Sequence, residues 1–215
     1  MSPEPLPEPP ADYGLLIDFP TLGKDDVPPR LYRVHRVDRA AEWFSTSGTM
    51  RFDPPGGAAD LFGTCYLAVD PVTALIEAVG DLPALTQQML DNRAMMVAQI
   101  PVTQKLANMT SPLVVGRWRL DRRISMGDDY EICQRWARAL RLAGFSGVYY
   151  EPRHDPSDRE EVRPASVALF ADPGYQPHMM ARDGDGPIST RVIERAEDVF
   201  GLQVLPSAPL PSAAI

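Results

Sequence analysis

Short segments in which apolar and polar residues alternate, or in which β-forming residues cluster, predict β-strands along much of the chain. Residues 31–36, LYRVHR, alternate in this way, and residues 63–69, GTCYLAV, are rich in β-formers and begin with a glycine. The remaining strands are expected in apolar runs at residues 95–102, 147–151 and 165–171, and SPLVVG at 111–116 is expected to be a short extended piece.

Apolar residues spaced three or four positions apart predict helices in other segments. The first is expected from Pro71 to about Gly80, because Asp70 is a good N-cap and proline suits the first helical position. A longer helix is expected at 130–142, where the apolar positions lie at helical spacing and Gly144 follows. Further helices are predicted at 83–92 and at 188–201, the latter amphipathic and capped by Ser189 or Thr190.

Strands and helices do not alternate regularly along the chain, so the pattern favours a compact α+β domain over a doubly wound sheet. Residues 28–205 are expected to form this single domain. Residues 1–27 form an acidic stretch with five prolines in its first twelve residues, and residues 206–215 are rich in Pro, Ala and Ser. Both ends are therefore predicted to be extended or disordered tails that contribute little to the core.

Composition limits the possible functions. The chain has 215 residues, 44% of them hydrophobic, which is enough for a substantial core. A net charge of −8 disfavours binding along a nucleic-acid backbone, and the arginines between 117 and 141 are interpreted as a solvated helix face. No apolar run approaches the roughly 18 residues of a membrane helix, and the N-terminus is unlike a signal peptide. We therefore expect a cytoplasmic protein that binds neither membrane nor nucleic acid directly.

The residues that commonly bind metals are too widely spaced for a metal site. Cys65 and Cys133 each lie in an apolar run, which predicts two buried free thiols. His35, His154 and His178 share no metal-ligand spacing. His154 is read as a loop residue or as a group at the edge of a pocket, and no metal or cofactor is expected.

Glu77 is the residue whose setting most favours catalysis. It lies one turn after Thr73 in a helix whose other residues are largely apolar. Because burying an unpartnered carboxylate costs several kcal/mol, Glu77 must face solvent, an arginine or a cleft. An exposed helical glutamate is one reading. The other is a carboxylate that stabilises the oxocarbenium-like state of N-glycosidic bond cleavage.

Two arginines and a tyrosine precede Glu77 within fifty residues. A guanidinium fork matches phosphate oxygens two at a time, so Arg33 and Arg51 are candidate ligands of a diphosphate. Arg51 could equally lie in a turn and pair with Asp53. Tyr66 either packs in the core or lines a cavity.

The segments LYR, RF followed by proline, and YLAVDPVTALIEA resemble the RES-domain toxins of bacterial toxin–antitoxin pairs. The resemblance covers about residues 28–172 and continues more weakly in GDDYEICQRWARAL and GVYYEPRHDP. It implies an ADP-ribosyltransferase-like fold with a mixed sheet core and flanking helices. It also implies degradation of NAD by hydrolysis or phosphorolysis, with inorganic phosphate as a possible co-substrate. Members of the family can instead ADP-ribosylate a protein.

By position, the resemblance implies that Arg33 and Arg51 bind the NAD phosphates, that Tyr66 lines the nicotinamide-ribose pocket, and that Glu77 is catalytic. The family is named for an arginine, a glutamate and a serine, and the serine has two possible registers. The first places Glu131 in the serine slot, with Ser125 six residues earlier, and makes Glu131 a candidate substrate ligand. Glu131 could also form a capping box with Asp128. The second register, through YYEPRH, places Pro152 in the slot.

The family resemblance also implies partners and alternatives. Such toxins are neutralised by a small helix-turn-helix antitoxin, and homodimerisation is plausible. The absent serine, together with the proline-rich ends, leaves open a chain that has lost turnover and serves as a binding module. Transfer of ADP-ribose to a macromolecule remains the second enzymatic alternative.

Overall fold

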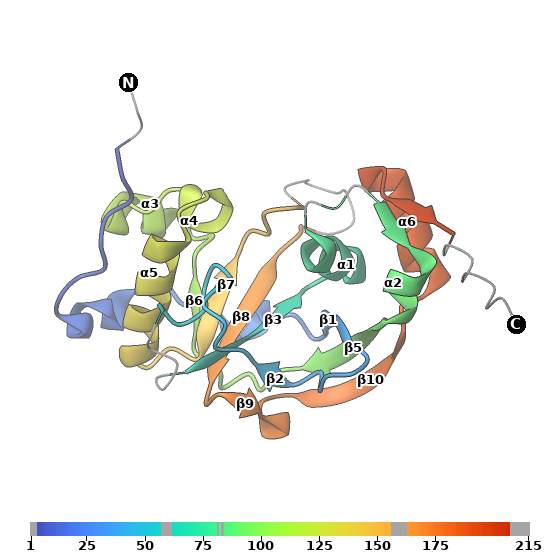
Figure 1. Ribbon diagram of the computed structural model, residues 1–215. Helices are drawn as coiled ribbons and strands as arrows, with labels where there is room; N and C mark the ends of the chain where they lie inside the picture. Colours follow the sequence, from blue (N-terminus) through green and yellow to red (C-terminus); the bar gives the residue numbers. More distant parts are fainter. Residues whose placement is uncertain (1–3, 57–61, 81, 83, 156–162, 207–215) are drawn as a thin grey trace, which may run out of the picture.

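The computed structural model describes residues 4–56, 62–80, 82, 84–155 and 163–206, and centres on a seven-stranded sheet (Figure 1). The strand order is β10-β5-β1-β3-β8-β7-β6, in which only β6 and β7 pair in parallel. The strands are β1 (Leu31–Arg36), β3 (Gly63–Ala68), β5 (Arg93–Gln99), β6 (Leu106–Asn108), β7 (Gly147–Tyr150), β8 (Ser166–Ala171) and β10 (Ala181–Pro187).

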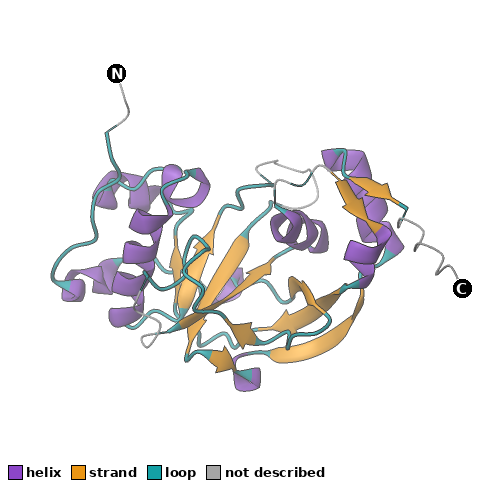
Figure 2. Cartoon of the chain, in the orientation of Figure 1, coloured by secondary structure: helices purple, strands orange, loops and turns teal. Residues whose placement is uncertain are grey.

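Helices and short elements flank this sheet in two groups (Figure 2). One group contains α3 (Pro112–Trp118), α4 (Arg123–Met126), α5 (Tyr130–Leu142) and the 3₁₀ turn η1 (Tyr13–Asp18). The other contains α1 (Pro71–Val79), α2 (Gln87–Asp91), α6 (Thr190–Phe200) and the small parallel pair β4 (Ala84–Thr86) and β11 (Gln203–Leu205). A second small pair joins β2 (Trp43–Phe44) to β9 (Gly174–Tyr175), and the turns η2 (Lys24–Asp26) and η3 (Pro177–Met179) complete the elements.

Two of the predicted helices have the bounds that their local signals indicate. In α1, Asp70 accepts a hydrogen bond from the Thr73 amide and Pro71 occupies the first turn. Helix α5 spans Tyr130–Leu142, with its apolar side buried around Trp136 and Leu140. The predicted α+β class is confirmed.

Three clusters of buried side chains form the core. The largest lies under α3–α5 and includes Phe19, Trp136 and Phe170. A second packs around β2 and one side of the sheet, with Phe44 and Met96. The third lies between α1, α2 and α6. Strands β1 and β3 share the single register pair Tyr32–Ala68 among the described residues, so they diverge away from that pair.

Of two further predicted elements, one is only partly correct and the other is wrong. The segment expected to be a helix at 83–92 contains β4 followed by the short helix α2, because Leu85 pairs with Val204 of β11, a partner far away in sequence. The expected extended piece at 111–116 lies in α3. Its start carries the ordinary helix signals, Ser111 as N-cap and Pro112 in the first turn, and these outweigh the β preference of the two valines.

The N-terminal segment is not the free tail that was predicted. Leu16 is 0% exposed and Phe19 only 2% exposed, and both belong to the largest core cluster. The Trp136 indole donates to the carbonyl of Pro7 at 2.9 Å, and Glu8 pairs with Arg135. Residues from at least Leu6 onward therefore pack on the domain. In the predicted C-terminal tail, residues 207–215 lie outside the described part of the chain.

The helices of the described residues are all too short or too polar to cross a membrane.

Candidate functional site

A cavity of about 300 Å³ opens where β1 and β3 diverge, and it brings together the main residues singled out from the sequence. Its walls come from β1, β3, α1, β8, the segment 45–51, the start of α5 and the loop after β7. Arg33, Arg51, Tyr66 and Glu77 all line it. Its volume is at the lower end of the range for ligand pockets, about 300–1,000 Å³, so a dinucleotide would extend beyond it.

Glu77 faces the cavity rather than bulk solvent, which excludes the reading as an exposed helical glutamate. Its Oε1 accepts a hydrogen bond of 2.6 Å from the backbone amide of His154, and one turn earlier Thr73 donates to Asp155 at 2.6 Å. These two contacts fix α1 against the loop after β7. Burial raises the pKa of Glu77, and the His154 amide and the positive charge of Arg51 act against that rise.

Arg51 is buried beside this carboxylate. Its Nη1 donates to the carbonyl of Gly127 at 2.8 Å, and its guanidinium lies over the ring of Tyr130 at 4.6 Å. Its Nη2 is buried and has no hydrogen-bond partner among the described residues. Arg51 does not pair with Asp53, which was the alternative drawn from the sequence. A buried donor without a partner is costly, so the arrangement suits an anion that enters from outside.

Arg33 reaches into the gap between β1 and β3. Its Nη1 donates to Cys65 Sγ at 3.0 Å and to the carbonyl of Tyr66 at 3.2 Å, and its Nη2 lies 3.5 Å from the carbonyl of Trp43. Its Nε is buried and unpartnered among the residues that the structure describes. Both predicted phosphate ligands therefore keep one donor that no other described group uses.

Tyr66 both packs and lines the cavity, so its two readings are not exclusive. Its hydroxyl donates to Asp53 Oδ1 at 3.0 Å and accepts from the Phe52 amide at 2.9 Å. The other carboxylate oxygen of Asp53 accepts from Ser47 and from the Met50 amide. These bonds hold both neighbours of Arg51, so the arginine is positioned by its backbone. Burial raises the pKa values of Tyr66 and Asp53.

Several cavity residues were not singled out as ligands from the sequence, among them four from α5, β7 and the loop after it. Tyr130 begins α5, Tyr150 ends β7, and Arg153 and His154 follow in the next loop. His154 lies at the pocket edge, one of its two predicted placements. The sequence signal that could have found Tyr150, Arg153 and His154 was the second alignment register, because it aligns YYEPRH with the family motif around the serine.

Glu131 does not belong to the cavity. Its side chain is 87% exposed and lies 3.6 Å from Arg135, one turn further along α5. The capping box is also wrong, because Asp129 is the N-cap and accepts from the Ile132 amide, while Asp128 pairs with Arg153. Ser125 is buried in α4, outside the cavity lining. A serine does line the cavity, namely Ser166 of β8, which the fold and not the sequence register brings there.

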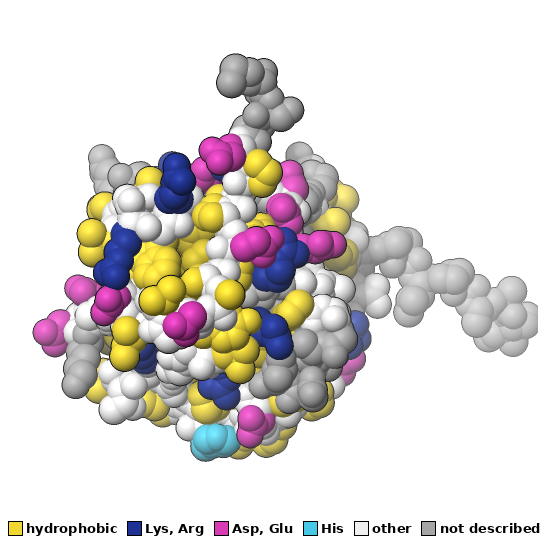
Figure 3. Space-filling model, turned by 90° about the vertical axis from the view of Figure 1, so that its left-hand side faces the viewer, with side chains coloured by type: hydrophobic (Ala, Val, Ile, Leu, Met, Phe, Trp, Pro, Cys, Tyr) yellow, Lys and Arg dark blue, Asp and Glu magenta, His cyan; other side chains and the backbone are white. Residues whose placement is uncertain are grey.

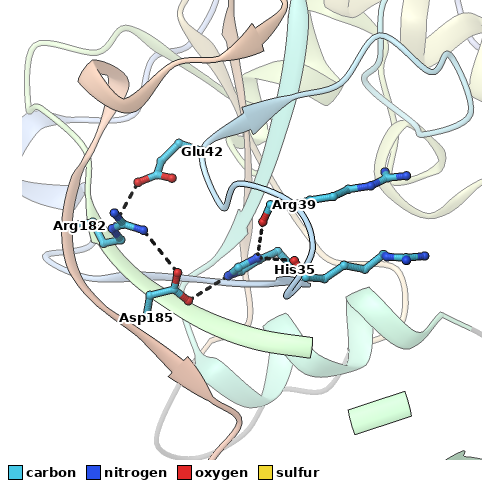
Figure 4. A network of polar contacts seen from close by, with 6 residues as sticks. His35, Arg39, Glu42, Arg182 and Asp185 are labelled. Carbon is cyan, nitrogen blue, oxygen red and sulfur yellow. Dashed lines mark hydrogen bonds and ion pairs between the residues drawn. The ribbon is translucent and has the colours of Figure 1, made fainter. Parts of the chain in front are cut away.

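A second group of charged residues lies outside this cavity and joins β1 to β10 (Figure 4). Asp185 accepts from His35 Nε2 at 2.9 Å and lies 3.4 Å from Arg182, whose Nε is 3.4 Å from the buried Glu42. His35 Nδ1 faces the carbonyls of Arg36 and Arg39. We call this group the β10 network.

The opposite side of the molecule offers a larger but more open hollow of about 570 Å³. It lies between α5 and the N-terminal segment, where Glu8 and Arg135 neutralise each other at 2.8 Å. The face that carries α3–α5 shows apolar side chains among charged ones (Figure 3). The hollow lacks a buried carboxylate like Glu77, so the Glu77 cavity is the better candidate for chemistry.

Both cysteines are buried and unbridged, as predicted. Among the described residues, no group of three or more His, Cys, Asp or Glu is arranged to hold a metal ion.

Comparisons with known proteins identify the family and a similar fold. A family model for the RES domain matches residues 30–185. No curated protein matches the chain. Among solved structures, a chain from the crystal structure of the M. tuberculosis MbcT–MbcA toxin–antitoxin complex is similar, with a TM-score of 0.61 and 14% sequence identity. The match covers 88% of this chain and 99% of that chain, so the two share their fold over nearly the whole length.

Proposed function

The chain belongs to the RES domain family, and from this premise we propose that it is a toxin that consumes NAD by cleaving the nicotinamide–ribose bond. The observation that carries the proposal is the placement of Glu77. A largely buried carboxylate, held by the His154 amide, lies in a cavity with Arg51 and Arg33. The family resemblance points to the same residues, and they line one cavity.

The two arginines supply the binding of the substrate. The guanidinium groups of Arg51 and Arg33 line the cavity, and each keeps one buried nitrogen without a partner among the described residues, so we assign them to the oxygens of the diphosphate. The backbone contacts around Arg51 fix its position before the substrate binds, which lowers the entropy that binding must overcome. Tyr66 packs beside the nicotinamide riboside.

Glu77 supplies the stabilisation of the transition state. The bond between nicotinamide nitrogen and the anomeric carbon breaks with its electron pair remaining on the nitrogen, so nicotinamide leaves as a neutral molecule. The ribose becomes oxocarbenium-like, and the Glu77 carboxylate stabilises this positive charge. An oxygen of water or of inorganic phosphate then bonds to the anomeric carbon. Water loses a proton in this step and gives ADP-ribose, whereas phosphate gives ADP-ribose phosphorylated at that carbon.

The loop after β7 bears on which acceptor is used. The second alignment register places Pro152 at the position of the family serine. Pro152 lies in the loop after β7, and the backbone amide of His154 in the same loop donates to Glu77. Proline offers no hydroxyl, so an acceptor would have to be oriented by other groups. Ser166 and His154 are the polar side chains of the cavity suited to that task. A protein acceptor is the alternative.

We further propose a cognate antitoxin of the helix-turn-helix type that covers the cavity. The similar chain comes from a toxin–antitoxin complex, which supports such a partner. A net charge of −8 is compatible with a basic partner protein. A cytoplasmic location and homodimerisation stay predictions.

The test is nicotinamide release from NAD by the purified chain, with and without inorganic phosphate. Glu77→Gln should reduce release by about 100-fold or more, and Glu131→Gln, which removes an exposed carboxylate outside the cavity, should leave it unchanged. Release that requires phosphate would identify a phosphorylase, and release without phosphate a glycohydrolase. Intact NAD after incubation with a chain that binds it would contradict NAD degradation and favour a protein acceptor or a binding module.

A further inference from the structure

Arg153 is a third cation at the cavity, and its contacts differ from those of Arg33 and Arg51. It follows β7 in the loop that also supplies the His154 amide to Glu77. Its Nη2 lies 2.7 Å from Asp128 Oδ1, and its Nη1 donates to the hydroxyl of Tyr130 at 3.4 Å. Its ion-pair partner is thus a carboxylate from a separate loop.

Tyr130 places Arg153 close to Arg51. The Arg51 guanidinium lies over the face of the Tyr130 ring at 4.6 Å, while Arg153 contacts the hydroxyl of the same side chain. Two guanidinium groups from different loops therefore converge on one aromatic side chain. A diphosphate carries its charge on two neighbouring phosphates, so two converging arginines match it better than one.

The partner of Arg153 is easily displaced. The Asp128 side chain is 87% exposed, whereas the Arg153 side chain is only 30% exposed. Exposed ion pairs contribute little to stability because water and salt screen them. A phosphate, which accepts from both arms of the guanidinium fork, is a stronger ligand than this single-contact carboxylate.

We propose that Arg153 binds a phosphate of the substrate diphosphate, and that Asp128 pairs with Arg153 until the substrate enters and the phosphate displaces the carboxylate. Asp128 is then an internal competitor, and the exchange of one anion for another requires no movement of the sheet or of α1. The inference rests on the proposed function for the identity of the substrate, but the anion exchange itself can be measured without turnover.

The alternative is that the ion pair only ties the loop between α4 and α5 to the loop after β7. The two readings predict opposite results for Asp128→Asn. A tether that is cut weakens the site or leaves it unchanged. A competitor that is removed strengthens ligand binding.

The experiment measures ADP-ribose binding by titration calorimetry, because ADP-ribose carries the diphosphate and cannot release nicotinamide. We expect Asp128→Asn to tighten binding about three- to fivefold and Arg153→Gln to weaken it about tenfold. Arg153→Lys, which keeps the charge but not the fork, should fall between Arg153→Gln and the unmodified chain. The double variant should bind like Arg153→Gln alone, because Asp128 competes only through Arg153.

The matched control is Glu131→Gln. Glu131 and Asp128 are equally exposed and both lie at the start of α5, but Glu131 pairs with Arg135 and not with Arg153. A general charge effect would therefore appear in both variants, and also in the Arg153→Gln background.

Equal binding by Asp128→Asn and Glu131→Gln would overturn the inference, as would unchanged binding by Arg153→Gln or the absence of ADP-ribose binding in every variant. A chain that shows the Asp128 effect but releases no nicotinamide would support the inference and contradict the proposed function. A chain that releases nicotinamide without the Asp128 effect would do the reverse.

Discussion

Two regions of the molecule contain the same kinds of charged residue and arrange them in opposite ways. The β10 network has a buried glutamate, a histidine, an arginine and an aspartate, and each has a charged partner within 3.4 Å. The Glu77 cavity also contains a glutamate, a histidine and arginines. There, however, Glu77 accepts from a backbone amide, and no ion pair joins it to another described residue.

The difference separates a structural cluster from a binding site. In the β10 network the charged groups pair with one another, so the cluster joins β1 to β10. In the cavity, Arg33 and Arg51 each retain a buried donor that no described residue uses. Buried donors without partners are costly, and a bound molecule or an ordered water can complete their bonding.

A large effect is expected when the two arginines that define the regions are changed in the same way. Arg51→Lys keeps the charge but cannot bond the Gly127 carbonyl and a phosphate together, so kcat/KM for NAD cleavage should fall about 10- to 100-fold. Arg182→Lys, its counterpart in the β10 network, should leave kcat/KM within about twofold. Steady-state kinetics on both variants measures this difference, and equal losses of kcat/KM would contradict it.

The pH dependence of activity should follow Glu77. Its carboxylate must be ionised to stabilise the cation, and burial raises its pKa above the usual value of about 4.3. As the pH falls through this raised pKa, kcat/KM should fall about tenfold per pH unit. Residual activity of Glu77→Gln should show no such slope. A slope that persists in this variant would assign the titration to another group.

Substitution of the two glutamates should change the free energy of unfolding in opposite directions. Glu42→Gln removes the charge that faces Arg182, which is partly exposed and screened, so stability should fall by about 1 kcal/mol. Glu77→Gln should increase stability at neutral pH. A raised pKa means that the folded chain binds the Glu77 proton more tightly than the unfolded chain does. The stability that Glu77 contributes is therefore complete below its unfolded pKa and is lost as the pH rises through the folded pKa.

Urea unfolding of both variants at pH 7 measures this difference. A loss of stability in Glu77→Gln would show that its carboxylate is a structural group like that of Glu42.

The smallest effect is expected at Tyr130. Tyr130→Leu removes the aromatic face under Arg51 and should cost about 0.5–1 kcal/mol in binding, a factor of about two to five in KM. Tyr130→Phe keeps the face and loses only the long contact of the hydroxyl with Arg153, so its KM should stay within about twofold. A larger loss in the phenylalanine variant would make the hydroxyl, and not the ring, the important group.

Sequence signals found those parts of the fold that depend on neighbouring residues. Asp70 with Pro71 fixes the start of α1 by contacts within one turn, and the spacing of Ile132, Trp136 and Leu140 fixes the buried side of α5. Helix α2 was misjudged because the strand before it forms only when β11 returns from residue 203. The N-terminal segment was misjudged because its few apolar residues find a core built by helices about a hundred residues later.

The candidate site divides in the same way. Glu77, Tyr66 and the two predicted arginines lie in the three segments that carry the family resemblance, so the resemblance finds them together. Arg153 and His154 lie more than seventy residues from Glu77 and reach it only because β7 ends beside α1. Glu131 was selected by the first alignment register. Its side chain lies on the exposed side of α5, which contradicts that register.

The most direct test of the comparison is one assay on the matched pair Glu77→Gln and Glu42→Gln. Nicotinamide released from NAD is measured for both variants and for the unmodified chain, in phosphate buffer, at equal concentrations of folded protein. We expect rapid release by the unmodified chain, nearly the same rate for Glu42→Gln, and at least about a 100-fold loss for Glu77→Gln. Equal rates for the two variants, or no release by the unmodified chain, would contradict the catalytic role of Glu77.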